Sequence, residues 1–348
     1  MNRQAWHQQP LTVLPKNHTM GNSLYQYLSL KIPHPLINFF SDIEQVIVRG
    51  NYKISATSSL EKPNKIFNVE RPVVNISNSI AYVNCFPGFD YILHFSSVIS
   101  SYFALLGVPI NIKPEYPTRK KCETELRNSL NSSIPNASTI VLGKVDFLSG
   151  LSSSTLWKGH EPFLWKPVDG FNNNAILLGC KHTIWGEIAG RLVSYLCKRG
   201  ANTVLYIGKL GSLDYQDFPN RLLATSSKSI LPNGQIIEWQ NLFTSANNLV
   251  IKAPHITVPS VMQETNDWFK LASLKARFVD PEIGWMALAA NNHSAKFSHL
   301  HIISDNLSSR NFPFNLSNER VPKALALRKK LYHEISLQIK KVIKKVAT

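Results

Sequence analysis

Uncharged apolar runs alternate with amphipathic segments along the second half of the chain. Three of the runs are short, which is typical of parallel strands buried on both faces, and they span residues 139–143, 175–179 and 203–207. Residues 185–199 carry apolar side chains at helical spacing, and Gly200 follows where helices often end. Strands are also expected at 222–224 and 248–251, and a helix is expected to carry Trp268 and Phe269. This alternation predicts a three-layer α/β fold.

Two acids, Glu282 and Asp305, are expected at the ends of neighbouring elements near the C-terminal end of this pattern. Asp280 and Pro281 suit the start of a helix, and Glu282 falls in its first turn, where the helix dipole favours a carboxylate. Residues 297–303 read as a strand, with Asp305 just past its end. Taken alone, these acids are better explained as ordinary helix-start and loop residues.

Several polar or glycine positions follow predicted strands directly. In open α/β sheets, ligands bind beyond the carboxyl ends of the strands. His182, Lys209 and Asp305 are therefore expected to line one cleft. Gly208 and Gly211 are expected in a turn, where glycine lets backbone amides approach a ligand closely.

The first third of the chain has a different pattern. Residues 1–35 are polar and Pro-interrupted, which predicts an irregular arm. Residues 36–131 are expected to form an α+β extension packed on the core, with strands near 45–49 and 81–84 and a buried helix at 91–106. A turn-rich boundary at 128–136 precedes the α/β domain, 139–348.

The last segment is strongly basic. Residues 321–346 are expected to form a helix with lysines outside and a buried stripe of Leu331, Ile335, Ile339, Val342 and Val346. The whole chain carries 38 Lys and Arg against 22 Asp and Glu, a formal charge of +16. Such a charge favours anionic partners, nucleic acid included, although the sequence has no nucleic-acid motif.

Composition narrows the class of protein further. With 44% hydrophobic and 17% charged residues, the chain is expected to fold. Neither a signal sequence nor an apolar run of about 20 residues is evident, so a cytoplasmic protein without a transmembrane segment is expected. The four scattered cysteines are expected to be free thiols. His299 and His301 point the same way along a strand, but no third ligand is suggested, so no metal is expected.

Three motifs in this half of the chain resemble those of the nucleoside phosphorylase and nucleosidase superfamily, over roughly residues 139–309. Tyr206-Ile-Gly-Lys-Leu-Gly-Ser-Leu213 looks like the family's glycine turn. Val279-Asp-Pro-Glu282 looks like Val-Glu-Met-Glu, and Ile303-Ser-Asp-Asn306 is similar to its Ile-Ser-Asp signature. The resemblance implies a three-layer α/β/α sandwich with a central mixed sheet.

The resemblance also implies roles for individual residues. Asp305 would protonate or hydrogen-bond the leaving base, and Glu282 would hold the ribose hydroxyls. His182 falls where the family lines its site. In the loop 255–264, the nearest candidates to face the base are Val258, Pro259 and Glu264.

This sequence departs from the family pattern at two positions. Pro281 replaces the middle Met of the second motif, and Tyr206 replaces an arginine that several phosphorylases have just before the glycine turn. Lys209 could replace the missing cation, or be a solvated turn residue. Phosphate therefore stays open as a co-substrate, no other cofactor is expected, and hydrolysis is slightly favoured over phosphorolysis.

Two classes of function follow from these residues. The first is an enzyme that cleaves the N-glycosidic bond of a nucleoside-like substrate, with Asp305 as general acid. The second is a silent module on the same fold that binds a nucleoside, a nucleotide or nucleic acid. Association of the chain with copies of itself is left open.

Overall fold

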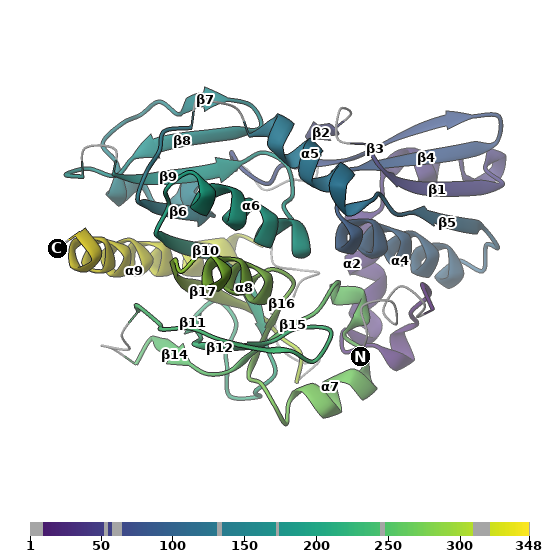
Figure 1. Ribbon diagram of the computed structural model, residues 1–348. Coiled ribbons are helices and arrows are strands. Elements are labelled where there is room, and N and C mark those ends of the chain that lie inside the picture. Colours follow the sequence, from purple (N-terminus) through teal and green to yellow (C-terminus); the bar gives the residue numbers. More distant parts are fainter. Residues whose placement is uncertain are drawn as a thin grey trace.

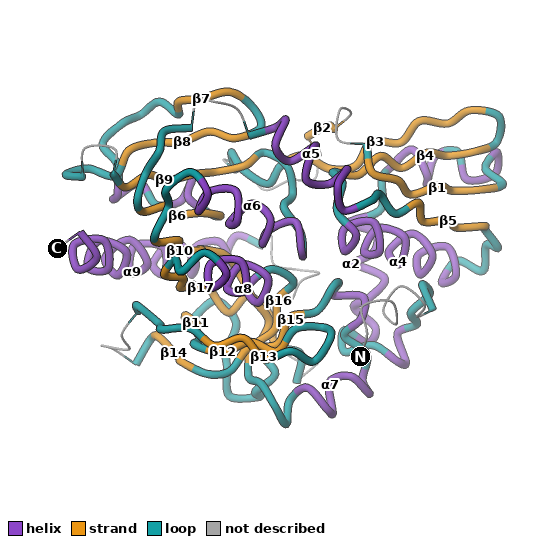
Figure 2. The backbone as a smooth tube through the Cα atoms, in the orientation of Figure 1, coloured by secondary structure: helices purple, strands orange, loops and turns teal. Residues whose placement is uncertain are grey.

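The computed structural model describes residues 10–51, 55–57, 65–130, 134–171, 174–243, 248–308 and 321–347. Two sheets lie side by side in Figure 1, the smaller one built from the first third of the chain. Figure 2 shows helices against both sheets and the long helix α9, Pro322–Ala347, crossing the larger part.

The larger sheet contains twelve strands in the described part of the chain. Its main path runs β13-β12-β15-β16-β10-β6-β9-β8-β7, while β17 pairs with β10 and β11, and β14 pairs with β11. The strands are β6 Thr139–Gly143, β7 Lys158–His160, β8 Phe163–Pro167, β9 Ala175–Cys180, β10 Thr203–Ser212, β11 Leu223–Thr225, β12 Lys228–Ile230, β13 Ile236–Glu238, β14 Val250–Lys252, β15 His255–Thr257, β16 Phe278–Asp280 and β17 Lys296–Asn306. The centre is parallel, since β9, β6, β10 and β17 run the same way, whereas β8, β11 and β16 join antiparallel partners.

Successive side chains of the central strands enter two different cores. Ile140, Leu142 and Val204 face the core that contains α6, Glu187–Lys198, and α8, Ile283–Asn292. Val141, Leu205 and Ile207 face a second core. That core contains the buried stripe of α9, formed by Leu331, Ile335, Ile339 and Val342, with Val346 partly buried. Alternation along each strand therefore places helices on both faces. The predicted three-layer α/β fold with a mixed sheet is confirmed.

The longest strand pair differs from the prediction. Residues 208–212 were expected as a turn, but β10 continues through them to Ser212 because β17 pairs with it along its whole length. Asp305 is likewise inside β17 rather than past its end. Residues 278–280 form β16, and the helix expected from Asp280 begins at Ile283.

The smaller sheet has the order β2-β3-β4-β1-β5, with β1 parallel to β4 and β5. Its strands are β1 Gln45–Gly50, β2 Ser55–Thr57, β3 Glu70–Ser77, β4 Ile80–Cys85 and β5 Asn111–Glu115. One core joins it to α4, Phe89–Leu105, whose apolar sequence suits burial. Two further elements are α5, Arg119–Ser129, and α7, Asn266–Ala272, which lies in the larger part.

Residues 10–35, the described part of the predicted irregular arm, are not irregular throughout. They include α2, Leu24–Lys31, and the start of α3, His34–Asn38. Leu24 and Leu28 are buried against the α4 core, so tertiary packing stabilises a helix that local sequence did not indicate. Helix α5 also covers the start of the boundary predicted at 128–136, and residues 131–133 lie outside the described residues.

Backbone hydrogen bonds join the first third of the chain to the larger part. The Asn68 N–H donates to the Cys180 carbonyl at 2.7 Å, and the Thr19 N–H donates to the Glu264 carbonyl at 3.1 Å. Asp90 of α4 accepts from the Glu187 N–H at 2.9 Å at the start of α6. The division into arm, extension and α/β domain stays a prediction.

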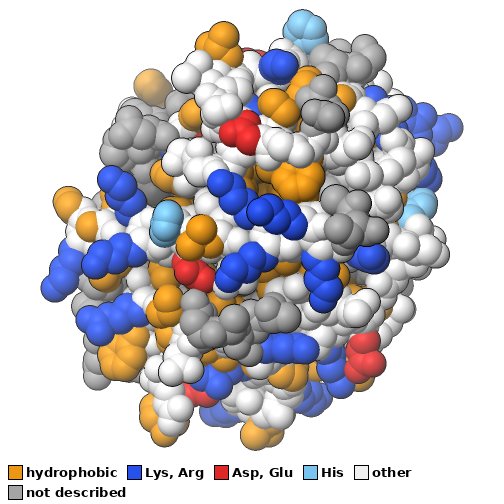
Figure 3. Space-filling model, turned by 90° about the vertical axis from the view of Figure 1, so that its left-hand side faces the viewer, with side chains coloured by type: hydrophobic (Ala, Val, Ile, Leu, Met, Phe, Trp, Pro, Cys, Tyr) orange, Lys and Arg blue, Asp and Glu red, His pale blue; other side chains and the backbone are white. Residues whose placement is uncertain are grey.

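One face of the molecule is rich in cationic side chains. Figure 3 shows the face on the left of Figure 1, where Lys and Arg side chains far outnumber Asp and Glu. None of the described helices is long and apolar enough to span a membrane. The four cysteines are free thiols.

Candidate functional site

A cavity of about 240 Å³ lies beyond the carboxyl ends of the central strands. Gly143 at the end of β6, Cys180 at the end of β9 and the second half of β10 form part of its wall. Residues of the N-terminal third form another part. This is the position in which open α/β sheets bind ligands.

Most of the predicted site residues line this cavity. They are His182, Gly208, Lys209, Gly211, Glu282 and Asp305. Val258 and Pro259 are outside the lining: Val258 is in a small apolar cluster with Leu213, and the Pro259 carbonyl accepts from Trp185 Nε1 at 2.8 Å. Glu264, from the same loop, does line the cavity.

A β-bulge positions Asp305. The pairing of β10 with β17 shifts between Leu210 and Gly211, so that Ser304 is the extra residue and Asp305 lies opposite Gly211. Ser304 Oγ donates to Asp305 Oδ1 at 2.7 Å, and both residues line the cavity. A Cβ on Gly211 would lie 2.7 Å from Leu307 Cδ1 and 3.1 Å from Asp305 Oδ2, so only glycine fits there. Bulges commonly redirect side chains next to active sites.

Glu264 is the partner of Asp305. Burial and then the negative charge of Asp305 raise the pKa of the Glu264 carboxyl well above its ordinary value. A carboxylate near a buried carboxyl group favours the protonated form of that group. The pair is therefore suited to hold a proton.

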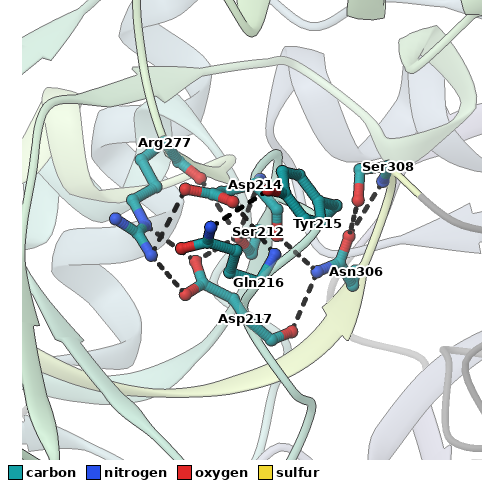
Figure 4. A network of polar contacts seen from close by, with 8 residues as sticks. All are labelled: Ser212, Asp214, Tyr215, Gln216, Asp217, Arg277, Asn306 and Ser308. Atoms are coloured by element: carbon teal, nitrogen blue, oxygen red, sulfur yellow. Dashed lines mark hydrogen bonds and ion pairs between the residues drawn. The ribbon is translucent and has the colours of Figure 1, made fainter.

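A network of polar contacts fixes the strand ends beside this pair (Figure 4). Arg277 binds Asp217 through two hydrogen bonds, Nε to Oδ2 at 2.9 Å and Nη2 to Oδ1 at 2.6 Å. Ser212 Oγ, at the end of β10, donates to Asp217 Oδ2 at 2.6 Å. Asn306 Nδ2 donates to the carbonyls of Asp214 and Asp217 at 2.7 and 2.8 Å. Because Asn306 follows Asp305, this network holds the end of β17 in place.

A second pair of acids lies at the start of α8. Asp280 Oδ1 accepts from the N–H groups of Glu282 and Ile283 at 3.0 and 2.9 Å, which is the capping predicted for Asp280. Burial, the charge of Asp280 and a hydrogen bond that Glu282 donates to it raise the pKa of Glu282 well above its ordinary value. Tyr206 also hydrogen-bonds Glu282, and burial followed by the two acids raises the Tyr206 pKa. The surroundings of Glu282 therefore favour its neutral form.

Three buried histidines lie behind Asp280. His255 Nε2 is 3.1 Å from Asp280 Oδ1, and His301 Nε2 is 3.9 Å from Asp280 Oδ2. Burial raises the pKa of Asp280, but hydrogen bonding and charge from His255, then the charge of His301, outweigh it and lower the pKa. Burial lowers the pKa of His301 to about 4. The His299 ring lies against that of His301, with centroids 4.9 Å apart.

Gly208 serves this histidine cluster. A Cβ at this position would lie 2.6 Å from His301 Nε2, so the glycine makes room for the ring. Among the described residues, no group of three His, Cys, Asp or Glu side chains is arranged to hold a metal ion.

The lining of the cavity also contains several cations. Lys31, Lys65 and Arg71 come from the N-terminal third, and Lys144 and Lys209 come from the larger part. His182 is paired with Glu70 of β3, Nδ1 to Oε2 at 2.5 Å, and its ring stacks on Phe86. His182 thus faces the extension as well as the cavity.

Sequence reasoning missed several cavity residues. Asp280 was assigned only a capping role, and Tyr206 was noted only for the arginine it replaces. Lys31 and Arg71 had no signal at all, because they precede the family-like region by more than 60 residues in the chain. The Val279-Asp-Pro-Glu282 motif itself could have suggested Asp280, since two acids flank the proline.

Comparison with known proteins gives structural neighbours only. No protein-family model and no curated protein matches the chain. Futalosine hydrolase of Helicobacter pylori is 16% identical, with a TM-score of 0.46, over 60% of this chain and 98% of its own. The 5′-methylthioadenosine/S-adenosyl homocysteine nucleosidase of the same organism is 15% identical, with a TM-score of 0.46, over 60% and 98%.

Purine nucleoside phosphorylase from Toxoplasma gondii is 10% identical, with a TM-score of 0.48, over 61% of this chain and 93% of its own.

Proposed function

We propose that this protein cleaves the N-glycosidic bond of a nucleoside-like substrate. The observation that carries the proposal is the presence of two buried carboxyl pairs, Glu264 with Asp305 and Asp280 with Glu282, in the wall of one cavity. Cleavage of such a bond places negative charge on the base and positive charge on the sugar. A proton donor and a charge-stabilising group are therefore both needed.

In the proposed reaction, the bond between C1′ and the base nitrogen breaks and its electron pair goes to the base. Asp305 passes to the leaving base the proton that it shares with Glu264. The second pair is suited to the sugar, because a neutral Glu282 carboxyl can donate one hydrogen bond to a ribose hydroxyl and accept another. The ionised Asp280 behind it stabilises the positive charge that develops on the sugar.

Water is the nucleophile that we favour. It adds to C1′ of the oxocarbenium-like sugar and loses a proton to solvent, giving a free sugar hydroxyl, and solvent returns a proton to the Glu264–Asp305 pair. Tyr206 stands where several phosphorylases have an arginine, and its hydroxyl is engaged with Glu282. Phosphorolysis, in which inorganic phosphate takes the place of water, is the alternative.

The test is release of free base from a panel of purine and pyrimidine nucleosides, deoxynucleosides, methylthionucleosides and nucleotides. Each substrate is incubated with and without inorganic phosphate, and the products are separated by chromatography. We expect release of base without added phosphate. Absence of release from every member of the panel would refute the proposal, and release only with phosphate would replace hydrolysis by phosphorolysis.

A further inference from the structure

The N-terminal third closes one side of the cavity. Helix α2 contributes Tyr27 and Lys31, the strand β3 contributes Arg71, and the segment before β3 contributes Lys65 and Asn68. All of these residues precede the α/β part of the chain. A substrate in the cavity therefore contacts the extension and the core at once.

The cations that line the cavity are partly buried. Lys31, Lys65, Arg71, Lys144 and Lys209 are each of intermediate exposure. Burial and then the positive charges of Lys31 and Arg71 lower the pKa of His94 to about 3, so both cations act on the same buried group. Partial burial limits screening by salt, so these charges act more strongly than surface charges.

Arg71 is held in a defined orientation. Its Nη1 donates to Asn68 Oδ1 at 3.0 Å, to the Glu70 carbonyl at 2.9 Å and to Thr183 Oγ1 at 2.8 Å. Thr183 belongs to the loop after β9, so the guanidinium links the extension to the core. Fixed guanidinium groups are suited to phosphoryl oxygens, which accept paired hydrogen bonds.

The charges that line the cavity do not cancel. The acids in the wall are Asp146, Glu264, Asp280, Glu282 and Asp305. Burial and a neighbouring acid raise the pKa values of Glu264 and Glu282, so these two acids tend to stay neutral beside the five cations of the lining. An excess of positive charge suits a phosphoryl group, which carries about −1.5 to −2 at neutral pH.

We infer that the substrate carries a phosphoryl group on its sugar, as in a nucleoside monophosphate. Lys31 and Arg71 of the N-terminal third of the chain bind this group. The inference rests on the proposed function for the position of the sugar. The base then lies toward Asp305 and Glu264, and the phosphoryl group lies toward the extension.

The test compares adenosine and uridine with their 5′-monophosphates, in the absence and presence of inorganic phosphate. We expect kcat/KM for a monophosphate to exceed that for its nucleoside by about 10-fold to 100-fold, the range of charge-assisted hydrogen bonds. Arg71→Ala should reduce this ratio by a similar factor. Because Arg71 also bonds Thr183, Lys31→Met, which keeps the apolar stem, is a second variant. Lys113→Ala, in exposed β5, is the matched control and should leave the ratio unchanged.

Three outcomes overturn the inference. Equal kcat/KM for nucleosides and monophosphates, or a ratio that neither variant changes, would do so while leaving the proposed function intact. Nucleoside cleavage that requires inorganic phosphate would assign the cations to a free phosphate ion instead.

If no compound releases base, the proposed function fails and thermal shift decides the inference separately. Stabilisation by adenosine 5′-monophosphate, absent with adenosine and lost in Arg71→Ala or Lys31→Met, would retain it. Equal shifts for the two compounds would overturn it.

Discussion

The acidic and the basic residues that line the cavity differ in how deeply they are buried. The acid wall, defined here as Glu264, Asp280, Glu282 and Asp305, is almost completely buried, and none of these residues is more than 7% exposed. The cation wall, defined as Lys31, Lys65, Arg71, Lys144 and Lys209, is only partly buried. Burial favours the neutral form of two of the acids by raising their pKa, whereas the cations stay in contact with solvent.

This difference in burial suits the two walls to different tasks, the acid wall to catalysis and the cation wall to substrate binding. Neutral, buried carboxyl groups are suited to proton transfer and to hydrogen bonding at a sugar. Partly exposed cations are suited to attracting and holding an anion without a large desolvation cost. The acid wall comes entirely from the α/β part. The cation wall comes largely from the N-terminal third of the chain, which contributes Lys31, Lys65 and Arg71.

The largest expected effect is on the acid wall. Asp305→Asn keeps the shape of the side chain but removes its proton, so turnover on the identified substrate should fall about 10²-fold to 10⁴-fold with little change in binding. Steady-state kinetics and a thermal melt measure both quantities. Asp267→Asn, on the exposed surface of α7, is the matched control. Near-normal turnover in Asp305→Asn would make Asp305 a structural residue.

The next effect concerns the support of the acid wall. Asp217 is 1% exposed at its side chain and is bound by Arg277 and Ser212. Asp217→Asn removes the charge opposite Arg277, and because Arg277 is partly exposed the free energy of unfolding should fall by about 2–3 kcal/mol. Urea unfolding measures this loss. Asp267→Asn again serves as control, and equal stability of the two variants would show that the network contributes nothing.

A smaller effect is expected in the pH dependence of stability. Glu264 and Glu282 have folded pKa values above the ordinary 4.5, so the folded protein retains protons that the unfolded chain releases. Their contribution to stability is complete below about pH 4.5 and is lost as pH rises through the folded pKa. Glu264→Gln and Glu282→Gln should therefore lose less stability on alkalinisation than the parent protein.

The measurement is urea unfolding of the parent protein and the variants between about pH 7 and pH 9. Glu238→Gln, on the exposed strand β13, is the control and should follow the parent curve. Identical slopes for all variants would mean that the two acids are ionised in the folded protein.

The smallest effect is expected outside the cavity. Lys340, Lys341 and Lys344 are exposed lysines near the end of α9, and neutralising them one at a time should change stability by no more than about 0.5 kcal/mol. KM should also stay unchanged. A change in KM comparable with that of Lys31→Met would show that net surface charge, rather than the cation wall, attracts the substrate.

Local patterns in the sequence determined much of this protein. Uncharged runs such as 139–143 and 203–207 predicted the central strands, because burial on both faces excludes polar residues. The spacing of Leu331, Ile335 and Ile339 predicted the buried face of α9, because helical periodicity repeats over short distances. Asp305 and Glu282 were found in the same way, from short motifs that adjoin regular elements.

Tertiary structure alone decided which residues share the cavity. Glu264 meets Asp305 from 41 positions away in the sequence, and Lys31 and Arg71 reach the same cavity from the first third of the chain. The bulge at Ser304 and the extension of β10 to Ser212 depend on pairing between strands separated by a helix and several loops. Such contacts depend on how whole elements pack, and no local pattern of apolar and polar residues encodes them.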